Sequence, residues 1–239
     1  MKFYKPLRPF KAISFDLDDT LYDNHPVIKK AEAAFFTYLT TTYSKLAPLT
    51  ERQWHLYKQK IVQETPTLKH DVTQWRQQTI QRIMVIYGIP MYDAIHYAAQ
   101  AMHEFLRLRS DFNVPPASLE LLQTLSQHYP VIAITNGNVD VKQIGLDRAF
   151  KFILKAGNGF KSKPHIDLFQ EAAAQLDINI SDILHVGDHL LTDVYGAQQH
   201  QAQAVWFNPQ KAALKKAKLL PCVEINDCQA LLKLLPHNS

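Results

Sequence analysis

The sequence has very few cysteines, no long apolar stretch and no run of basic residues, and each lack excludes a class of protein. Its 239 residues include only two cysteines, Cys222 and Cys228. Two cysteines without CxxC spacing make neither a disulfide framework nor a zinc site, so we expect reduced thiols, as in a cytoplasmic protein. The N-terminus lacks the apolar segment of a signal peptide, and no stretch approaches the length that spans a bilayer.

The charge balance is mild. Lys and Arg number 26 against 22 Asp and Glu, which gives a formal net charge of +4, and the basic residues are scattered. This distribution favours an ordinary solvated surface over a nucleic-acid-binding one. Hydrophobic residues make up 46% of the chain, enough to bury a core. We therefore expect a cytoplasmic globular protein that binds neither nucleic acid nor membrane.

Short apolar runs alternate with helical patterns over much of the chain. Runs of about four residues without polar alternation are typical of strands buried on both faces of a parallel sheet. This alternation of strands and helices along the chain predicts a doubly wound α/β domain, with the sheet between two layers of helices. The apolar runs are 12–15, 131–134, 152–154, 183–186 and 204–207, and the helical patterns are 117–128, 166–176, 193–201 and 208–219.

This alternation is interrupted once, directly after the first strand. Residues 22–108 contain no convincing buried strand but several amphipathic helical patterns. Thr50 and Gln53 form a capping-box pattern, and Gly88 is placed to end a helix. We therefore predict a helical cap domain at 22–108, inserted into an α/β core made of 1–21 and 109–239. The four helical patterns are 27–43, a helix that opens at Thr50, 71–87 and 92–108.

Polar residues stand directly after three of the predicted strands. Asp16 and Asp18 follow the first strand, Thr135 follows the second, and Asp188 lies just beyond a later one. In open parallel sheets, ligands bind beyond the carboxyl ends of the strands. We therefore expect these side chains, far apart in sequence, to meet at one edge of the sheet.

Such a cluster suits phosphoryl transfer. An ionised carboxylate attacks phosphorus without needing a base, so Asp16 is the candidate nucleophile. Asp18, two residues later, is the candidate general acid and base. Because the carboxylate and the phosphate repel each other, a Mg²⁺ ion is expected between them. Mg²⁺ prefers oxygen ligands, which Asp16, Asp188 and the backbone carbonyl of Asp18 would supply.

The same reasoning assigns residues to the phosphate itself. Thr135 and the backbone amides near Asn136 and Gly137 are placed to hold phosphate oxygens. Lys163, in the sequence Ser-Lys-Pro, would set a fixed cation against those oxygens and steady the Asp16 carboxylate. The expected substrate is a small-molecule phosphate ester.

These motifs together resemble those of the haloacid dehalogenase superfamily. Residues 16–20 resemble its DxDxT signature, and the end of the strand at Thr135, Lys163 and residues 187–193 resemble its second, third and fourth motifs. The motifs occur in family order, and the resemblance covers the whole chain. It implies a Rossmann-like core, a helical cap after the first motif, and support of the metal site by Asp193, either directly or through water.

A subgroup of this superfamily is more similar still. Segments 15–24, 70–76 and 133–138 are similar to bacterial phosphatases that act on flavin mononucleotide and on 5-amino-6-(5-phospho-D-ribitylamino)uracil, an intermediate of riboflavin synthesis. The resemblance leads us to expect an acidic residue at position 189, where this chain has His189. That departure changes the charge expected around the metal site.

His185 lies inside an apolar run and is interpreted as a hydrogen-bonded core histidine.

Candidate specificity residues lie in the predicted cap. His70, Asp71, Trp75 and Arg76 fall on one side of a predicted helix, and Arg109 lies at the return to the core. Trp75 is suited to stacking on an aromatic ring, and Arg76 to binding a polar edge of the substrate. The alternative is that Trp75 belongs to the core of the cap and the others form a solvated face.

Other functions remain open for the same set of residues. A sugar phosphomutase or a phosphoglycolate-type phosphatase would use the same groups, whereas a dehalogenase attacks carbon and needs no Mg²⁺. A non-catalytic phosphate-binding module is a further alternative. Asp18 and the paired carboxylates disfavour the dehalogenase, and the intact set of Asp16, Asp18, Lys163 and Asp188 disfavours the non-catalytic module.

Overall fold

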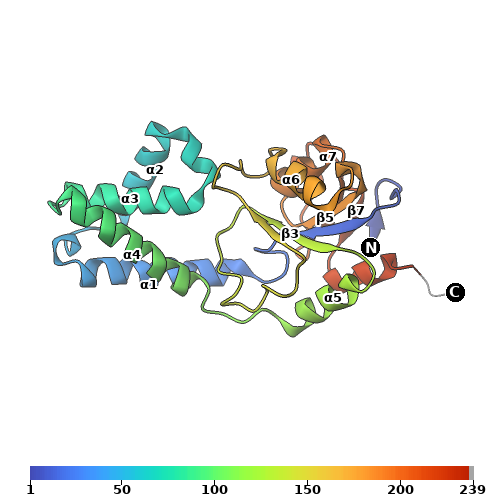
Figure 1. Ribbon diagram of the computed structural model, residues 1–239, viewed down its shortest axis with the longest axis horizontal. Coiled ribbons are helices and arrows are strands. Elements are labelled where there is room, and N and C mark those ends of the chain that lie inside the picture. The colour runs from blue at the N-terminus through green and yellow to red at the C-terminus, as the bar shows by residue number, and fades with distance from the viewer. Residues whose placement is uncertain (237–239) are drawn as a thin grey trace. The chain divides into compact units, whose positions relative to one another are not determined.

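The computed structural model describes residues 1–236, which fall into two compact units (Figure 1). The core unit comprises residues 1–23, 113–137 and 145–236, and the helical unit comprises 24–112 and 138–144. The longer segment of the helical unit, 24–112, begins and ends within a few residues of the predicted 22–108. The helical unit also takes in the segment 138–144, which the sequence-based boundaries assign to the core.

Within residues 1–236, the core unit is built on a seven-stranded sheet in the order β1-β7-β6-β5-β2-β3-β4. Neighbouring strands are parallel, except that β1 pairs antiparallel with β7. The predicted parallel α/β sheet is therefore confirmed. The strands are β1 (Lys2–Phe3), β2 (Ala12–Phe15), β3 (Val131–Thr135), β4 (Ile153–Lys155), β5 (Ile183–Gly187), β6 (Gln203–Phe207) and β7 (Val223–Ile225).

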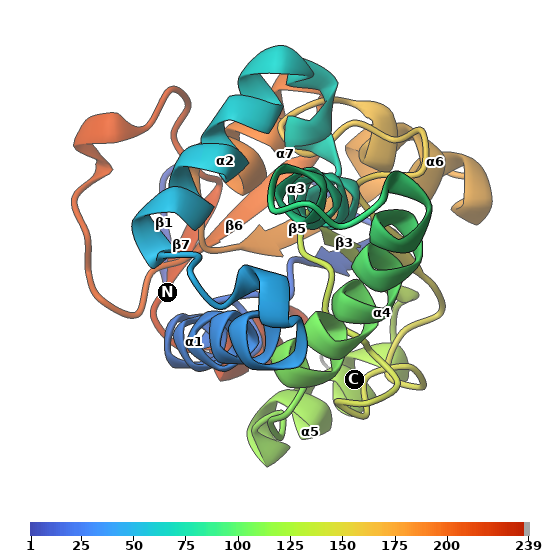
Figure 2. The same ribbon diagram turned by 90° about the vertical axis from the view of Figure 1, so that its left-hand side faces the viewer.

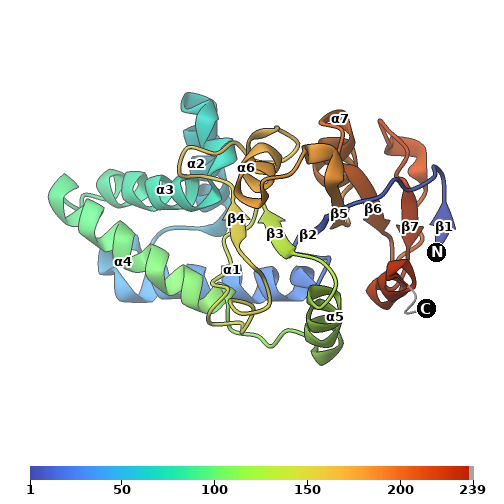
Figure 3. The same cartoon turned by 45° about the vertical axis from the view of Figure 1, so that its right-hand side comes forward.

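Helices cover both faces of this sheet (Figure 3). One face carries α6 (Asp167–Leu176), the π-helical segment η4 (Leu190–Tyr195) and α7 (Gly196–Gln199). The opposite face carries α5 (Pro116–Ser126), which contacts η6 (Cys228–Leu234). Burial of the large apolar side chains beneath these helices contributes roughly 2 kcal/mol each. The 3-10 turns η3 (Ile180–Asp182) and η5 (Leu214–Lys216) complete the unit.

Parallel pairing brings the carboxyl ends of the central strands together. In β2, Phe15 pairs with Ala133 of β3 on one side and with Val186 of β5 on the other. The next backbone amide, that of Asp16, donates to the Val186 carbonyl at 2.9 Å, which extends the ladder by one residue. The residues that follow β2, β3 and β5 therefore emerge at the same edge of the sheet.

The helical unit consists of four main helices around an apolar core. Helix α4 contacts both α1 and α3, and Figure 2 looks along α1 and α3 with α4 beside them. The predicted capping box is present, since the Thr50 side chain accepts from the Gln53 backbone and Gln53 reaches back to the Thr50 amide. The elements are α1 (Asn24–Thr42), η1 (Ser44–Leu46), α2 (Glu51–Glu64), η2 (Pro66–His70), α3 (Val72–Ile86) and α4 (Met91–Arg109).

The segment 138–144 is held by the helical unit through three hydrogen bonds. The Asn138 side chain donates to Thr73 Oγ1 at 3.2 Å, and the Asp140 amide donates to Ser110 Oγ at 2.9 Å. The Gln143 side chain donates to the Arg107 carbonyl at 3.0 Å. These partners lie at the start of α3 and the end of α4, so the segment ties two helix ends together.

None of the helices in residues 1–236 is long and apolar enough to cross a membrane.

The predicted helix at 208–219 is wrong. That segment is a loop with one 3-10 turn, η5, because the Asn208 side chain satisfies the local backbone instead of a helix. It donates to the Ala212 carbonyl at 3.1 Å and accepts from the Ala212 amide at 2.8 Å. Lys211 between them has a positive φ of 53°, which does not fit a helix. The short strands β1 and β7 lie outside the apolar runs used for the prediction.

Candidate functional site

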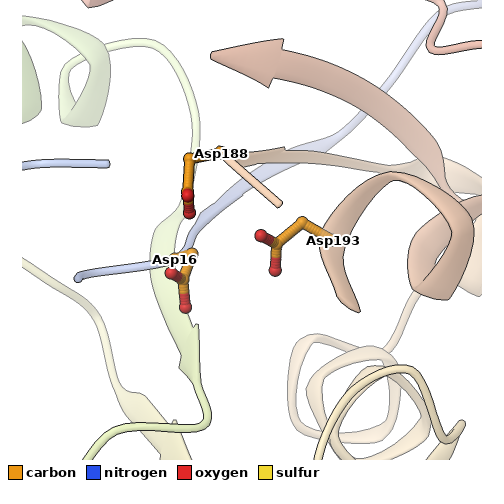
Figure 4. A group of neighbouring side chains, drawn as sticks. All are labelled: Asp16, Asp188 and Asp193. Atoms are coloured by element: carbon orange, nitrogen blue, oxygen red, sulfur yellow. The ribbon is translucent and has the colours of Figure 1, made fainter. Parts of the chain in front are cut away.

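Three carboxylates meet at the carboxyl edge of the sheet in the core unit. Asp16 follows β2, Asp188 follows β5, and Asp193 lies in η4. Their nearest oxygen atoms all lie within 4.8 Å of one another. Figure 4 shows the three side chains as close neighbours, with Asp193 directed toward the other two. The structure therefore brings together Asp16 and Asp188, as the sequence led us to expect. It also places the Asp193 carboxylate in the same cluster.

Lys163 is the cation fixed among these acids. Its Nζ lies 2.7 Å from Asp16 Oδ1 and 2.7 Å from Asp193 Oδ1, and it donates to the Ile134 carbonyl at 2.6 Å. An ammonium group has three protons, so these partners account for all of them. The side chain is only 1% exposed. Lys163 therefore acts as a buried clamp between two of the three carboxylates.

Burial and crowding shift the ionisation of the cluster. Burial raises the pKa of Asp16 to about 8, against the opposing effect of Lys163, and the nearby Asp193 and Asp18 carboxylates add to the rise. Burial likewise raises the pKa of Asp188 to about 7, with Asp193 and Asp19 adding to it. Burial alone would also raise the pKa of Asp193, but Lys163 and His185 outweigh it and hold that pKa below its ordinary value.

This set of donors fits a divalent cation. The cluster holds more carboxylates than the single Lys163 ammonium neutralises, and Asp188 is not among the partners of that ammonium. A small divalent ion with a preference for oxygen ligands would offset the remaining charge and favour full ionisation of the acids. The carboxylate oxygens at this edge, from two buried residues and the half-buried Asp188, are thus suited to metal binding.

Asp193 is held from three sides, which suits a supporting role. Its Oδ2 accepts the His189 backbone amide at 2.9 Å, while Oδ1 faces both Lys163 and His185. A Cβ added at Gly187 would lie 2.5 Å from the Asp193 side chain, so glycine is required for this close approach. His189 itself caps η4, because its Nδ1 accepts the amides of Leu191 and Thr192.

His185 is the predicted hydrogen-bonded core histidine, and this prediction is confirmed. Its Nδ1 lies 2.8 Å from Ser14 Oγ and its Nε2 lies 3.4 Å from Asp193 Oδ1. An ionised Asp193 can only accept, so Nε2 carries the proton and Nδ1 accepts from the Ser14 hydroxyl. Burial lowers the pKa of His185 to about 4, and Lys163 adds to the lowering.

A pH dependence of stability follows from this buried histidine. The folded pKa of about 4 lies below the ordinary 6.5, so the unfolded chain binds more protons between these values. We expect the free energy of unfolding to fall as the pH drops from 6.5 toward 4, with His185 contributing up to about 3 kcal/mol. Urea unfolding with a chelator present, compared between wild type and His185→Gln, measures this contribution.

The comparison rests on slopes rather than on absolute stability. His185→Gln should weaken the dependence of stability on pH in this window, whereas His128→Gln, at an exposed histidine of the same unit, should leave it unchanged. Equal slopes for wild type and His185→Gln would show that His185 does not titrate in the way its burial indicates.

The candidate phosphate residues have well-defined partners in the core unit. Thr135 is buried, and its hydroxyl accepts the Gly137 amide at 3.0 Å. Asn136 clasps the backbone of Lys163, since its Oδ1 accepts the Lys163 amide at 2.8 Å and its Nδ2 donates to the Lys163 carbonyl at 3.0 Å. The Asn136 side chain therefore positions Lys163. The sequence, which predicts only a turn at Asn136, does not reveal this role.

Asp18 lies beside this loop. A Cβ added at Gly137 would be 2.5 Å from Asp18 Oδ2, and Asp18 Oδ1 accepts the Tyr22 hydroxyl at 2.6 Å. Tyr22 is a site residue that the sequence reasoning missed. The available signal was its spacing four residues after Asp18 across a turn. Thr20 lies nearby, with its hydroxyl 3.5 Å from Asp188 Oδ1.

The candidate specificity residues all lie in the helical unit, where several have structural partners. Asp71 caps α3 by accepting the Gln74 amide at 2.9 Å. Trp75 donates through Nε1 to the Lys58 carbonyl at 2.7 Å, and the Lys58 ammonium lies 5.1 Å from the centre of its ring. His70 ends η2 and is partly buried.

Arg76 is buried at the centre of this group. Its Nη2 donates to Glu32 Oε1 at 2.9 Å, and its guanidinium lies 3.6 Å from the centre of the Phe105 ring. Its Nη1 is buried without a hydrogen-bond partner among the described residues. Arg109 is also buried, at 2% exposure, and its positive charge repels that of Arg76. Glu32 lies 44 positions before Arg76, so their pairing has no local sequence signal.

Comparisons with known proteins agree with this geometry. A family model described as haloacid dehalogenase-like hydrolase matches residues 10–201. Over 238 residues the chain is 38% identical to the 5-amino-6-(5-phospho-D-ribitylamino)uracil phosphatase YigB of Escherichia coli (strain K12), with 98% of this chain and 100% of that protein covered. It is 27% identical to a glyceraldehyde 3-phosphate phosphatase of Pyrococcus furiosus, with 87% of this chain and 84% of that protein covered.

A solved structure is also similar. The crystal structure of a 2-haloacid dehalogenase from Pseudomonas syringae pv. Tomato aligns with a TM-score of 0.89 and 33% identity. The alignment covers 94% of this chain and 97% of that one. The fold therefore has a counterpart of known structure over 94% of the chain.

Proposed function

Because the chain belongs to the haloacid dehalogenase-like hydrolase family, we propose that it is a Mg²⁺-dependent phosphatase in which Asp16 is the nucleophile. The observation that carries the proposal is the gathering of the Asp16, Asp188 and Asp193 carboxylates around one point, with Lys163 clamped between two of them. Such a site combines a nucleophile with positive charge for a phosphate group, as phosphoryl transfer requires.

The proposed substrate is a phosphomonoester of a ribityl chain. The relative YigB is named for its action on 5-amino-6-(5-phospho-D-ribitylamino)uracil, and it matches this chain along its full length. Flavin mononucleotide carries the same kind of primary ribityl phosphate and is the second proposed substrate. Glyceraldehyde 3-phosphate, for which more distant relatives are named, belongs to the same broad class of small phosphate esters.

In the first step, the Asp16 carboxylate attacks phosphorus. Lys163 holds Oδ1, so we assign the attack to Oδ2. A bond forms between Oδ2 and phosphorus as the bond from phosphorus to the ester oxygen breaks. Asp18 gives its proton to that oxygen, which leaves as an alcohol. The products of this step are an aspartyl phosphate on Asp16 and an ionised Asp18.

In the second step, water releases the phosphate. The ionised Asp18 takes a proton from a water molecule, whose oxygen attacks phosphorus. The bond between phosphorus and Asp16 breaks, which restores the Asp16 carboxylate and the protonated Asp18 together with inorganic phosphate. Asp18 thus acts as the acid in one half of the reaction and as the base in the other.

A bound Mg²⁺ ion would supply the charge that lets the carboxylate approach the phosphate anion. Asp16, Asp188 and the backbone carbonyl of Asp18 would hold it, with Asp193 in support. Asp193 contributes by keeping Lys163 and the His189 backbone in place. His189 caps η4 and carries no acidic charge. Asp193, in the first turn of the same element, supplies a carboxylate there instead.

Dehalogenation is the second candidate, because a structurally similar protein is a 2-haloacid dehalogenase. Attack on carbon needs neither a general acid nor a divalent ion. Three crowded carboxylates and an additional Asp18 would lower the stability of such an enzyme without contributing to its reaction. We therefore favour the phosphatase, and the two activities are separated by measuring phosphate and halide release with and without a chelator.

A screen of phosphate esters tests the proposed function. The purified protein is assayed with Mg²⁺ against the ribitylamino-uracil phosphate, flavin mononucleotide, glyceraldehyde 3-phosphate, sugar phosphates, nucleotides and phosphoglycolate. We expect the two ribityl phosphates to have the highest kcat/KM, by about tenfold or more over the others. EDTA should abolish turnover and added Mg²⁺ should restore it.

Each outcome of this screen bears on a separate part of the proposal. Hydrolysis of a different ester in a Mg²⁺-dependent way would replace the substrate and leave the chemistry standing. Product analysis that finds a rearranged sugar phosphate would point to a mutase. Turnover that is unaffected by EDTA, or halide release without phosphate release, would refute the phosphatase.

A further inference from the structure

Tyr22 is a buried residue that contacts the proposed general acid, Asp18, which is itself only partly buried. The Tyr22 side chain is 5% exposed, and its hydroxyl donates to Asp18 Oδ1 at 2.6 Å. Once Asp18 has given up its proton, this bond from a hydroxyl to a carboxylate is charge-assisted and therefore stronger than one between neutral groups. The bond therefore fixes the orientation of the Asp18 carboxyl group.

The backbone around Tyr22 is built to maintain this contact. Asp19 has a positive φ of 59°, and the Leu21 amide donates to the Leu17 carbonyl at 3.0 Å, so the chain turns sharply after Asp18. Asp18 and Tyr22 then pair as an isolated bridge. The neighbouring Leu21 carbonyl accepts the Ser118 hydroxyl at 2.6 Å, which anchors the turn to α5.

The second oxygen of Asp18 has a different environment. Oδ2 lies against Gly137, where an added Cβ would come within 2.5 Å of it. Gly137 follows Thr135 and Asn136 in the loop that we assign to the phosphate. The two carboxyl oxygens are therefore distinguished by their neighbours, because one binds Tyr22 and the other faces the phosphate loop.

We propose that Tyr22 is a positioning residue that turns Asp18 Oδ2 toward the leaving oxygen of the substrate. The assignment rests on the proposed phosphatase function. In the first step the proton moves from Oδ2 to the ester oxygen, and the electron pair of the O–H bond stays on the carboxylate. The hydrogen bond from Tyr22 to Oδ1 stabilises the carboxylate so formed, and Tyr22 keeps its own proton throughout.

The leaving group of the substrate provides the test. An alkyl phosphate needs a proton on its departing oxygen, whereas 4-nitrophenyl phosphate leaves readily without one. In Tyr22→Phe we expect kcat/KM for an alkyl phosphate such as flavin mononucleotide to fall about 30-fold. For 4-nitrophenyl phosphate it should change by less than about threefold. The ratio kcat/KM excludes the later hydrolysis of the aspartyl phosphate, because it reports only the steps through departure of the leaving group.

Tyr4→Phe is the matched control. Tyr4 also lies in the core unit and donates to a carboxylate, Glu224 Oε2, at 2.6 Å, but it follows β1, which pairs with β7 at the edge of the sheet. Its loss should leave both substrates unaffected. In an Asp18→Asn background, Tyr22→Phe should cause no further fall with the alkyl phosphate, because there is no proton left to position.

The outcomes separate this inference from the proposed function. Equal losses with both substrates, no loss with either, or an undiminished effect in the Asp18→Asn background would each overturn the assignment of Tyr22 while the phosphatase stands. A wild-type protein that releases phosphate from neither substrate would overturn both. A selective loss with the alkyl phosphate, absent in Tyr4→Phe, is the result that the geometry predicts.

Discussion

Replacing Asp16 with asparagine is expected to lower kcat by about 10⁵-fold or more while the protein remains folded. An amide oxygen does not attack phosphorus, so the first bond of the proposed reaction cannot form. The fold should survive, because the change removes one of three crowded carboxylates whose burial opposes ionisation. Steady-state kinetics on the best substrate of the screen, together with circular dichroism and thermal unfolding, measures both effects.

An exposed aspartate gives the control for this variant. Asp147→Asn, in a surface loop of the core unit, makes the same chemical change and should leave kcat within about twofold of wild type. Substantial turnover by a folded Asp16→Asn protein, beyond the level of contaminating wild type, would mean that the nucleophile lies elsewhere.

Lys163→Met is expected to affect stability and activity together. Methionine keeps the bulk of the side chain but removes the ammonium that contacts Asp16 and Asp193 at 2.7 Å each. The two acids are then left buried without that partner, and we expect a loss of about 3 kcal/mol in the free energy of unfolding. Loss of positive charge at the phosphate should lower kcat/KM by about 10³-fold.

Lys161→Met, two residues away at an exposed position, is the matched control and should change neither quantity appreciably. Urea unfolding of the three proteins at neutral pH measures stability, and added Mg²⁺ should recover part of the loss in Lys163→Met by supplying charge to the same acids. A variant as stable and active as wild type would show that the two short contacts contribute little.

The main features of the core unit follow from sequence pattern. Apolar runs without alternation, such as 131–134 and 183–186, have no polar face to expose, so they lie within a parallel sheet covered on both sides. Parallel pairing then forces residues that follow these runs to one edge. The meeting of Asp16 and Asp188 is thus a consequence of topology, and this is why it could be predicted.

Elements held by few or non-local contacts could not be predicted in this way. β1 and β7 are two and three residues long and give no periodic signal. The helical pattern at 208–219 fails because the Asn208 side chain bonds to the local backbone, a competition that periodicity does not register. The attachment of 138–144 to the helical unit depends on three side-chain hydrogen bonds to distant residues.

Side-chain orientation separates what the sequence reveals about the site from what it does not. Residue type and position indicate that Asp16, Asp18 and Lys163 share a site. Which oxygen of Asp18 faces the phosphate loop depends on Tyr22 and Gly137, and the placement of Lys163 depends on the Asn136 clasp. Such details arise only once the turns after β2 and β3 are folded next to each other.

The central claim is that Asp16 becomes phosphorylated during turnover with Mg²⁺. The most direct measurement is a rapid acid quench of the enzyme during turnover of the best substrate, followed by proteolysis and mass spectrometry of the peptides. We predict a peptide that contains Asp16 and carries the added mass of one phosphoryl group, absent when EDTA is present. Turnover with no phosphorylated peptide, or with the phosphoryl group on another residue, would contradict the account.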